Sequence, residues 1–169
     1  PDVYEGSPTP VTAFFSVAPK AAGIALILRF TYSIFSVKGA FGNTDFILSI
    51  AWPQIIAVIS AITMTLGNLL AIQQSNVKRM LAYSSIAHVG YMLMAFTVLS
   101  SDAILAVLVY IFIYFFMNLA AFFFVIKVSN HQGSSDLSVY KGYASIDPLS
   151  SAFMVIALVS LAGLPPMSG

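Results

Sequence analysis

One lysine lies deep inside an apolar stretch of the sequence. Lys20 falls about ten residues into an apolar run that begins near Pro10, so in a membrane helix it would lie about 15 Å deep. A lysine at that depth costs about 2.5–3.5 kcal/mol on insertion scales and should therefore face protein or water. We expect Lys20 to transfer protons. The alternatives are a snorkelling lysine or a static buried ion pair.

The residue before this lysine strengthens the functional interpretation. Pro19 has no N–H, so a carbonyl one turn earlier loses its helical partner, and we expect it to bind water or the ammonium of Lys20. No acidic residue is predicted inside a helix; the six fall in loops or at helix ends: Asp2, Glu5, Asp45, Asp102, Asp136 and Asp147.

A second group of polar residues follows helical spacing. Ser84 and His88 are four residues apart, while Ser85, His88 and Tyr91 step by three, so hydroxyls and an imidazole gather along one side of a helix. An imidazole accepts a proton on one nitrogen and releases one from the other, which suits a relay. A neutral histidine that hydrogen-bonds to a neighbouring helix is the alternative.

The same predicted helix begins with a basic pair, Lys78 and Arg79. A basic pair at a helix end can anchor the helix to lipid headgroups. Alternatively, Lys78 lies at the mouth of a proton half-channel, and both interpretations of Lys78 stay open. Further along the chain, Tyr110, Tyr114 and Asn118 are spaced by four and form a polar stripe that holds water or packs between helices.

The elements that position these residues are apolar helices. Of the 169 residues, 59% are hydrophobic and 8% charged, and the mean hydropathy is +0.93. This composition excludes an ordinary soluble globule, and a net charge of +1 gives no basic surface for nucleic acid. The absence of cysteine excludes thiol catalysis and cysteine-ligated metals, and two histidines are too few for a haem or zinc site.

We predict an all-α fold, a polytopic transmembrane helix bundle that forms one domain over residues 1–169. The five predicted membrane helices cover about 10–35, 49–72, 77–99, 102–128 and 148–164. A turn is predicted over 36–48, a helix N-cap at Ser101 or Asp102, and an interfacial stretch over 129–147 with Tyr140 and Tyr143 at headgroup level. Pro165-Pro166 interrupts the last helix, and interrupted helices mark ion pathways.

Three segments resemble one family in order and spacing. They are Pro1-Asp2-Val3-Tyr4-Glu5-Gly6-Ser7-Pro8-Thr9-Pro10-Val11 followed by Ala18-Pro19-Lys20, then residues 76–91 (NVKRMLAYSSIAHVGY), then residues 160–169 (SLAGLPPMSG). The sequence is similar to the antiporter-like membrane subunits of respiratory complex I, and the first segment to the type called subunit N in bacteria and subunit 2 in mitochondria. The chain is then expected to be the central part of a longer subunit.

The resemblance implies a proton-translocating membrane-arm subunit of NADH:quinone oxidoreductase. Lys20 matches the family's connecting lysine and His88 a histidine in the helix that opens with the basic pair. The family's other buried lysines and its glutamate would lie before Pro1 and after Gly169. NADH, FMN, iron–sulfur clusters and quinone are expected in partner subunits and no cofactor in this chain. The expected partners are other membrane-arm subunits and the lipid bilayer, not nucleic acid. A bacterial plasma membrane is favoured over a mitochondrial or plastid inner membrane.

Two other functions remain open from the sequence. The first is a subunit of a cation/proton antiporter or a membrane-bound hydrogenase, because these share the helix breaks. The second is a structural membrane scaffold that transports nothing, in which Lys20 and His88 only satisfy each other or lipids.

Overall fold

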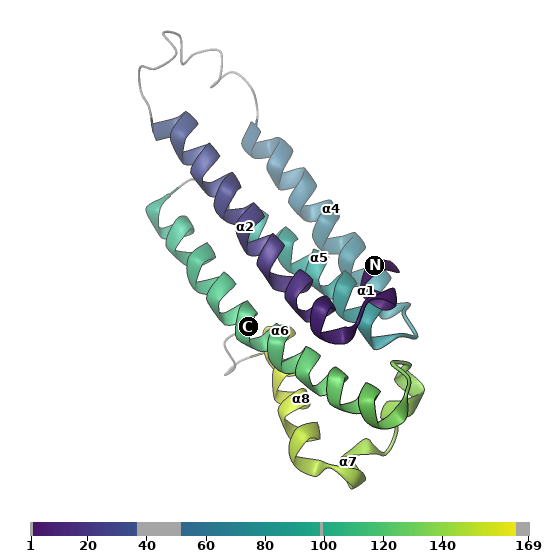
Figure 1. Cartoon of the computed structure of the whole chain (residues 1–169). Helices are drawn as coiled ribbons and strands as arrows, with labels where there is room; N and C mark the ends of the chain where they lie inside the picture. Colours follow the sequence, from purple (N-terminus) through teal and green to yellow (C-terminus); the bar gives the residue numbers. More distant parts are fainter. Residues whose placement is uncertain (1, 37–51, 99, 165–169) are drawn as a thin grey trace.

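The structure is a computed structural model that describes residues 2–36, 52–98 and 100–164 (Figure 1). The turn predicted over 36–48, apart from Ser36, and the Pro165-Pro166 interruption lie outside these residues. The described elements are helical: α1 (Asp2–Gly6), α2 (Thr9–Ser36), α4 (Trp52–Ile72), α5 (Val77–Ala95), α6 (Ser101–Gln132), the 3₁₀ helix η1 (Leu137–Tyr140), α7 (Tyr143–Ile146) and α8 (Pro148–Leu161). The predicted all-α membrane bundle is therefore the observed fold class.

Three of these helices are long and apolar enough to cross a membrane: Thr9–Thr31 within α2, all of α4, and all of α6. Helix α8 is apolar but has only 14 residues. At 1.5 Å per residue it is about 21 Å long and covers part of the bilayer core. In Figure 1, α2 and α5 run one way and α4 and α6 the other, while α8 rises from the far end of α6 toward its middle.

Local capping explains where the observed helix ends differ from the predicted ones. Helix α5 ends at Ala95 instead of 99, because the Phe96 N–H turns back to the Leu93 carbonyl at 3.1 Å. Helix α6 continues to a left-handed Gly133, whose N–H bonds to Ser129. Its N-cap is Ser100, so the prediction of Ser101 or Asp102 was wrong by one or two residues: the Ser100 Oγ accepts the Ala103 N–H at 3.0 Å.

Helix α5 lies at the centre of the bundle. None of its residues from Val77 to Gly90 is exposed. It packs along α4 and also contacts α1, α2 and α6. The approach to α4 is close enough to need glycine: a Cβ on Gly67 would lie 2.7 Å from the Ala87 backbone nitrogen, and one on Gly90 would lie 2.9 Å from the Met64 nitrogen. Small residues at helix contacts are typical of membrane bundles.

The segment predicted to lie at the interface is partly folded into the core. Its first residues extend α6, and the remainder contains η1 and α7. Tyr143 is only 3% exposed and meets Phe124 edge to face at 5.7 Å, so its ring packs against α6. The level of Tyr140 and Tyr143 relative to the lipid headgroups stays a prediction.

Candidate functional site

Lys20 and α5 meet inside the bundle. Lys20 stands eleven residues after the first residue of α2, about 16 Å along the helix. Its ammonium donates a hydrogen bond to the Ser85 hydroxyl, and the Ser85 Oγ in turn donates to the Ala82 carbonyl at 2.5 Å. Ser85 is buried. A hydroxyl that accepts from an ammonium and donates to a carbonyl uses both of its hydrogen-bonding roles, so it fixes the ammonium position.

The carbonyl released by Pro19 has found another partner. Pro19 lies inside α2, and the carbonyl four residues earlier belongs to Phe15. The Tyr4 hydroxyl donates to this carbonyl at 2.9 Å. The expected bond from the Lys20 ammonium to this carbonyl is therefore absent, because Tyr4 provides the donor and Lys20 bonds to Ser85 instead.

His88 lies one turn beyond Ser85 and is surrounded by tyrosines. It is 5% exposed, and its Nδ1 shares a hydrogen bond of 2.6 Å with the Tyr110 hydroxyl. Its ring centroid lies 5.0 Å from that of Tyr114 and 5.7 Å from that of Tyr91. The imidazole therefore has a proton donor or acceptor on one nitrogen, while apolar ring faces exclude water from its flanks.

Tyr114 packs against His88 near Ser85. Its hydroxyl is buried and has no hydrogen-bond partner among the described residues. Ser85 therefore has Lys20 on one side and the Tyr114 hydroxyl on another, one helical turn from His88. No hydrogen bond within the described part of the chain links the Tyr114 hydroxyl to Ser85 or to His88.

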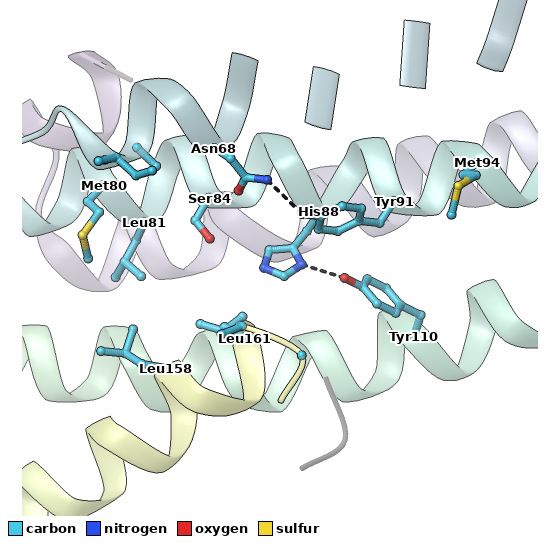
Figure 2. Close-up of a pocket in the computed structure, with 14 residues that line it drawn as sticks. Asn68, Met80, Leu81, Ser84, His88, Tyr91, Met94, Tyr110, Leu158 and Leu161 are labelled. Carbon is cyan, nitrogen blue, oxygen red and sulfur yellow. Dashed lines mark hydrogen bonds between the residues drawn. The ribbon is translucent and has the colours of Figure 1, made fainter. Parts of the chain in front are cut away.

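A cavity of about 650 Å³ opens on the other side of His88 (Figure 2). Five polar residues line it along with apolar ones: Asn68, Ser84, His88, Tyr91 and Tyr110. Figure 2 shows the Asn68 amide bonded to the Tyr91 hydroxyl, at 2.9 Å, and the His88 ring bonded to Tyr110. The other nine lining residues are apolar or glycine, so the lining is mainly apolar. Lys20 and Ser85 are not among its lining residues.

The end of α8 forms one wall of this cavity. Leu158, Leu161 and Gly163 line it, and Gly163 has a positive φ of 73° where the helix turns away. The Ser160 hydroxyl contacts the Met117 sulfur of α6 at 2.6 Å. The C-terminal end of this short helix, whose Leu158, Val159 and Ser160 carbonyls accept backbone N–H groups of the turn that follows, thus lines the same cavity as the imidazole.

The basic pair at the start of α5 binds α1. The Lys78 ammonium donates to the Glu5 carbonyl at 2.7 Å, and Arg79 pairs with Asp2 at 3.5 Å and with Glu5 at 3.4 Å. Asn76 caps the helix beneath them by accepting from the Lys78 N–H at 2.9 Å. Lys78 lies seven residues before Ser85, about 10 Å along the axis, so the structure does not bring Lys78 into the Lys20 and His88 group.

The rest of the polar stripe on α6 binds α2. Asn118, only 2% exposed, donates to the Ser16 hydroxyl, which donates to the Ala13 carbonyl at 2.6 Å. This chain of bonds fixes α6 against α2 one turn below Lys20. Of the stripe, Tyr110 and Tyr114 therefore belong to the His88 group, whereas Asn118 connects two helices.

The ion pairs among the described residues lie away from the site. Beyond the Arg79 pairs, Lys127 binds Asp147 and donates to the Ser150 hydroxyl at 2.7 Å. Hydrogen bonds from Lys127 and Ser150 lower the pKa of Asp147 to about 2. In the described part of the chain, no carboxylate lies within ion-pair distance of Lys20. The described residues also contain no cluster of three metal-ligating side chains.

Sequence reasoning missed Tyr4 and Asn68 as members of the site. Tyr4 could have been found by asking which donor satisfies the carbonyl that Pro19 releases, because a helix carbonyl that has lost its N–H partner needs another donor. Asn68 gave no such signal, since a single amide in an apolar helix could face any neighbour.

Comparisons with known proteins identify the family of the chain. The whole chain, residues 1–169, matches the family described as "NADH:quinone oxidoreductase/Mrp antiporter, TM". It is 49% identical over 169 residues to an NADH-quinone oxidoreductase subunit N 2 of Chloroherpeton thalassium, with all of the chain and 32% of the relative covered. It is 46% identical over 171 residues to a subunit N of an Anaeromyxobacter species, with all of the chain and 33% of the relative covered.

A third relative carries a different name. It is an NAD(P)H-quinone oxidoreductase subunit 2 of Prochlorococcus marinus, 44% identical over 169 residues, with all of the chain and 30% of the relative covered. The chain thus spans about a third of the length of the relatives it matches. The match over every residue shows that this chain belongs to the NADH:quinone oxidoreductase/Mrp antiporter family of membrane proteins.

Proposed function

We propose that the chain is the proton-transferring part of a membrane-arm subunit of a bacterial NADH:quinone oxidoreductase in the plasma membrane. Relatives at 46–49% identity carry the subunit N name. NADH oxidation and quinone reduction belong to partner subunits, which hold the flavin, the iron–sulfur clusters and the quinone. The chain itself contributes the path of protons through the membrane, in contact with the other membrane-arm subunits.

One observation carries the proposal. The Lys20 ammonium lies mid-helix inside the bundle and bonds to a neutral hydroxyl, with no described carboxylate paired to it. A lysine held only by neutral partners gains or loses a proton without breaking an ion pair. In the scaffold alternative Lys20 and His88 satisfy each other or lipids, whereas here Lys20 bonds to Ser85 and His88 bonds to Tyr110.

The proposed direction of transfer follows the polar groups. Lys20 exchanges a proton through Ser85 and the neighbouring Tyr114 hydroxyl toward His88, and His88 exchanges it with water in the cavity of Figure 2. The imidazole carries the proton on one nitrogen while Tyr110 holds the other. We assign Lys78 to the mouth of the path, two helical turns from Ser85, where it also holds α1.

The test replaces Lys20 in the full-length subunit of the assembled complex. Lys20→Ala and Lys20→Met should lower proton pumping and NADH:quinone reductase activity together, while the amount of complex stays near normal. Lys20→Arg should also fail, because a guanidinium stays protonated. Lys141→Met, at an exposed lysine in a connection, is the matched control and should have no effect. Full coupled activity in Lys20→Ala, at normal complex levels, would refute the proposal.

The family also includes Mrp antiporters. Membrane vesicles that contain the assembled complex therefore also test the alternative of a cation/proton antiporter. A sodium or potassium gradient that drives proton movement without NADH would indicate a cation/proton antiporter. Pumping that requires NADH and quinone, with co-purifying flavin and iron–sulfur subunits, supports the oxidoreductase.

A further inference from the structure

The first helix of the chain has no role in the proton path described above, although it touches both Lys20 and the start of α5. Lys78 and Arg79 hold α1 by a bond to the Glu5 carbonyl at 2.7 Å and by ion pairs to Asp2 and Glu5. The charges of α1 are therefore compensated on one side, which leaves its remaining polar residue, Tyr4, on the side of α2.

Tyr4 is fixed at both ends. Its hydroxyl donates to the Phe15 carbonyl at 2.9 Å, the carbonyl that lacks a helical partner because of Pro19. Its own carbonyl accepts from the Thr12 hydroxyl at 3.1 Å, and Thr12 is fully buried. A tyrosine held through backbone and hydroxyl has little freedom to turn its ring.

The fixed ring lies over the Lys20 ammonium. The Lys20 Nζ is 5.7 Å from the Tyr4 ring centroid, inside the distance at which a cation is attracted by the negative face of a ring. Ser85 holds the same ammonium from α5. The ammonium therefore lies between a ring face on α1 and a hydroxyl on α5, and neither partner carries a charge.

We propose that Tyr4 is a positioning residue for Lys20. The Tyr4 ring face holds the protonated amine of Lys20 on Ser85 and releases this amine when it is neutral. The inference deepens the proposed function and rests on it. An aromatic ring attracts a cation and has no comparable attraction for a neutral amine. The side chain of Lys20 is then held toward His88 while it carries a proton and becomes free to move when it does not.

Two simpler roles for Tyr4 make different predictions. If Tyr4 only fills space, leucine serves as well as phenylalanine. If only its hydrogen bond to Phe15 matters, phenylalanine fails as badly as leucine. A ring that positions a cation tolerates phenylalanine, which keeps the π face, and does not tolerate leucine.

The experiment measures pumping per assembled complex in vesicles for Tyr4→Phe and Tyr4→Leu, in the full-length subunit. We expect Tyr4→Phe to stay within about twofold of the native rate and Tyr4→Leu to lose about fivefold, the size of a partly buried cation–ring contact. NADH oxidation with an artificial acceptor measures the amount of complex and should not change. Val3→Ala, at an exposed neighbour on the same helix, is the matched control.

If the complex with Tyr4→Leu fails to assemble, a second substitution tests the inference: an aromatic ring of similar shape whose π face carries less negative charge. Trifluorophenylalanine at position 4 should reproduce the loss relative to phenylalanine, because fluorine withdraws the negative charge from the ring face. Equal pumping with both rings would overturn the inference, as would equal losses in Tyr4→Phe and Tyr4→Leu. Full activity of Tyr4→Leu beside an inactive Lys20→Ala would refute the inference and leave the proposed function standing.

Discussion

Replacing Gly67 by alanine tests whether α4 and α5 pack through their backbones. A Cβ on Gly67 would lie 2.7 Å from the Ala87 nitrogen and 3.0 Å from its Cα. Non-bonded heavy atoms prefer about 3.5–4.0 Å, so the two helices must separate by about 1 Å at this point. No rotamer change relieves the contact, because the nearest atoms belong to the backbone of Ala87.

The expected cost has two parts. Overpacking of a tight contact costs about 1–3 kcal/mol. The separation also lengthens the bond between the Ser60 hydroxyl and the Gly90 carbonyl, now 2.7 Å, by about 1 Å, and an interhelical bond in a membrane contributes about 0.6 kcal/mol. Together Gly67→Ala should destabilise the α4–α5 contact by about 2–3 kcal/mol, close to a hundredfold in the population of the packed state.

The assay is the thermal stability and yield of the purified complex that carries the variant subunit. Gly23→Ala is the matched control, since nothing lies within 4 Å of a Cβ at this position of α2, and it should have no such effect. Adding Ala87→Gly to Gly67→Ala should not rescue it, because the shortest contact is to the Ala87 nitrogen. Native stability in Gly67→Ala, or full rescue by Ala87→Gly, would refute the backbone contact.

Three further predictions concern helix ends and the histidine. The pKa of Asp147 lies at about 2, below its ordinary value of 3.8, so its bonds to Lys127 stabilise the fold above about pH 4 and are lost as the pH falls toward 2. Asp147→Asn should therefore lower the thermal stability of the complex by the same amount at every pH from 5 to 8. Tyr110→Phe leaves His88 without its partner and should slow pumping about tenfold at equal amounts of complex. Ser100→Ala removes the α6 N-cap and should cost about 1 kcal/mol in thermal unfolding of the complex.

The position of Lys20 along its helix could be predicted because it depends only on helix rise and on where the apolar run begins. The predicted start is Pro10 and the helix begins at Thr9, a difference of about 1.5 Å. The partner of Lys20 could not be predicted, since it depends on which side of α5 faces α2. Ser85 was on the predicted polar side of its helix, but so were Ser84 and Tyr91.

Helix geometry explains how that predicted side divides. Successive residues turn by about 100°, so Ser84 and Ser85 face different neighbours: Ser85 binds Lys20, while Ser84 lines the His88 cavity. Residues six apart differ by about 120°, which turns Tyr91 away from Ser85, toward Asn68, and leaves it 37% exposed. Spacing by three thus correctly predicts that Ser85 and His88 are neighbours, but it does not predict that Tyr91 turns away from Ser85.

The central helix is the least apolar of the long helices for a physical reason. Hydropathy selects α2, α4 and α6, the helices whose large apolar side chains remain exposed in the structure, and it does not select α5. Helix α5 carries Ser85 and His88 and has no exposed residue from Val77 to Gly90. A polar helix is stable in a bilayer only where other helices cover it. The least apolar long segment between apolar helices can keep its polar side chains only in the interior of the bundle. Because a proton path also requires that interior, this segment is the place in the sequence where we expect the path.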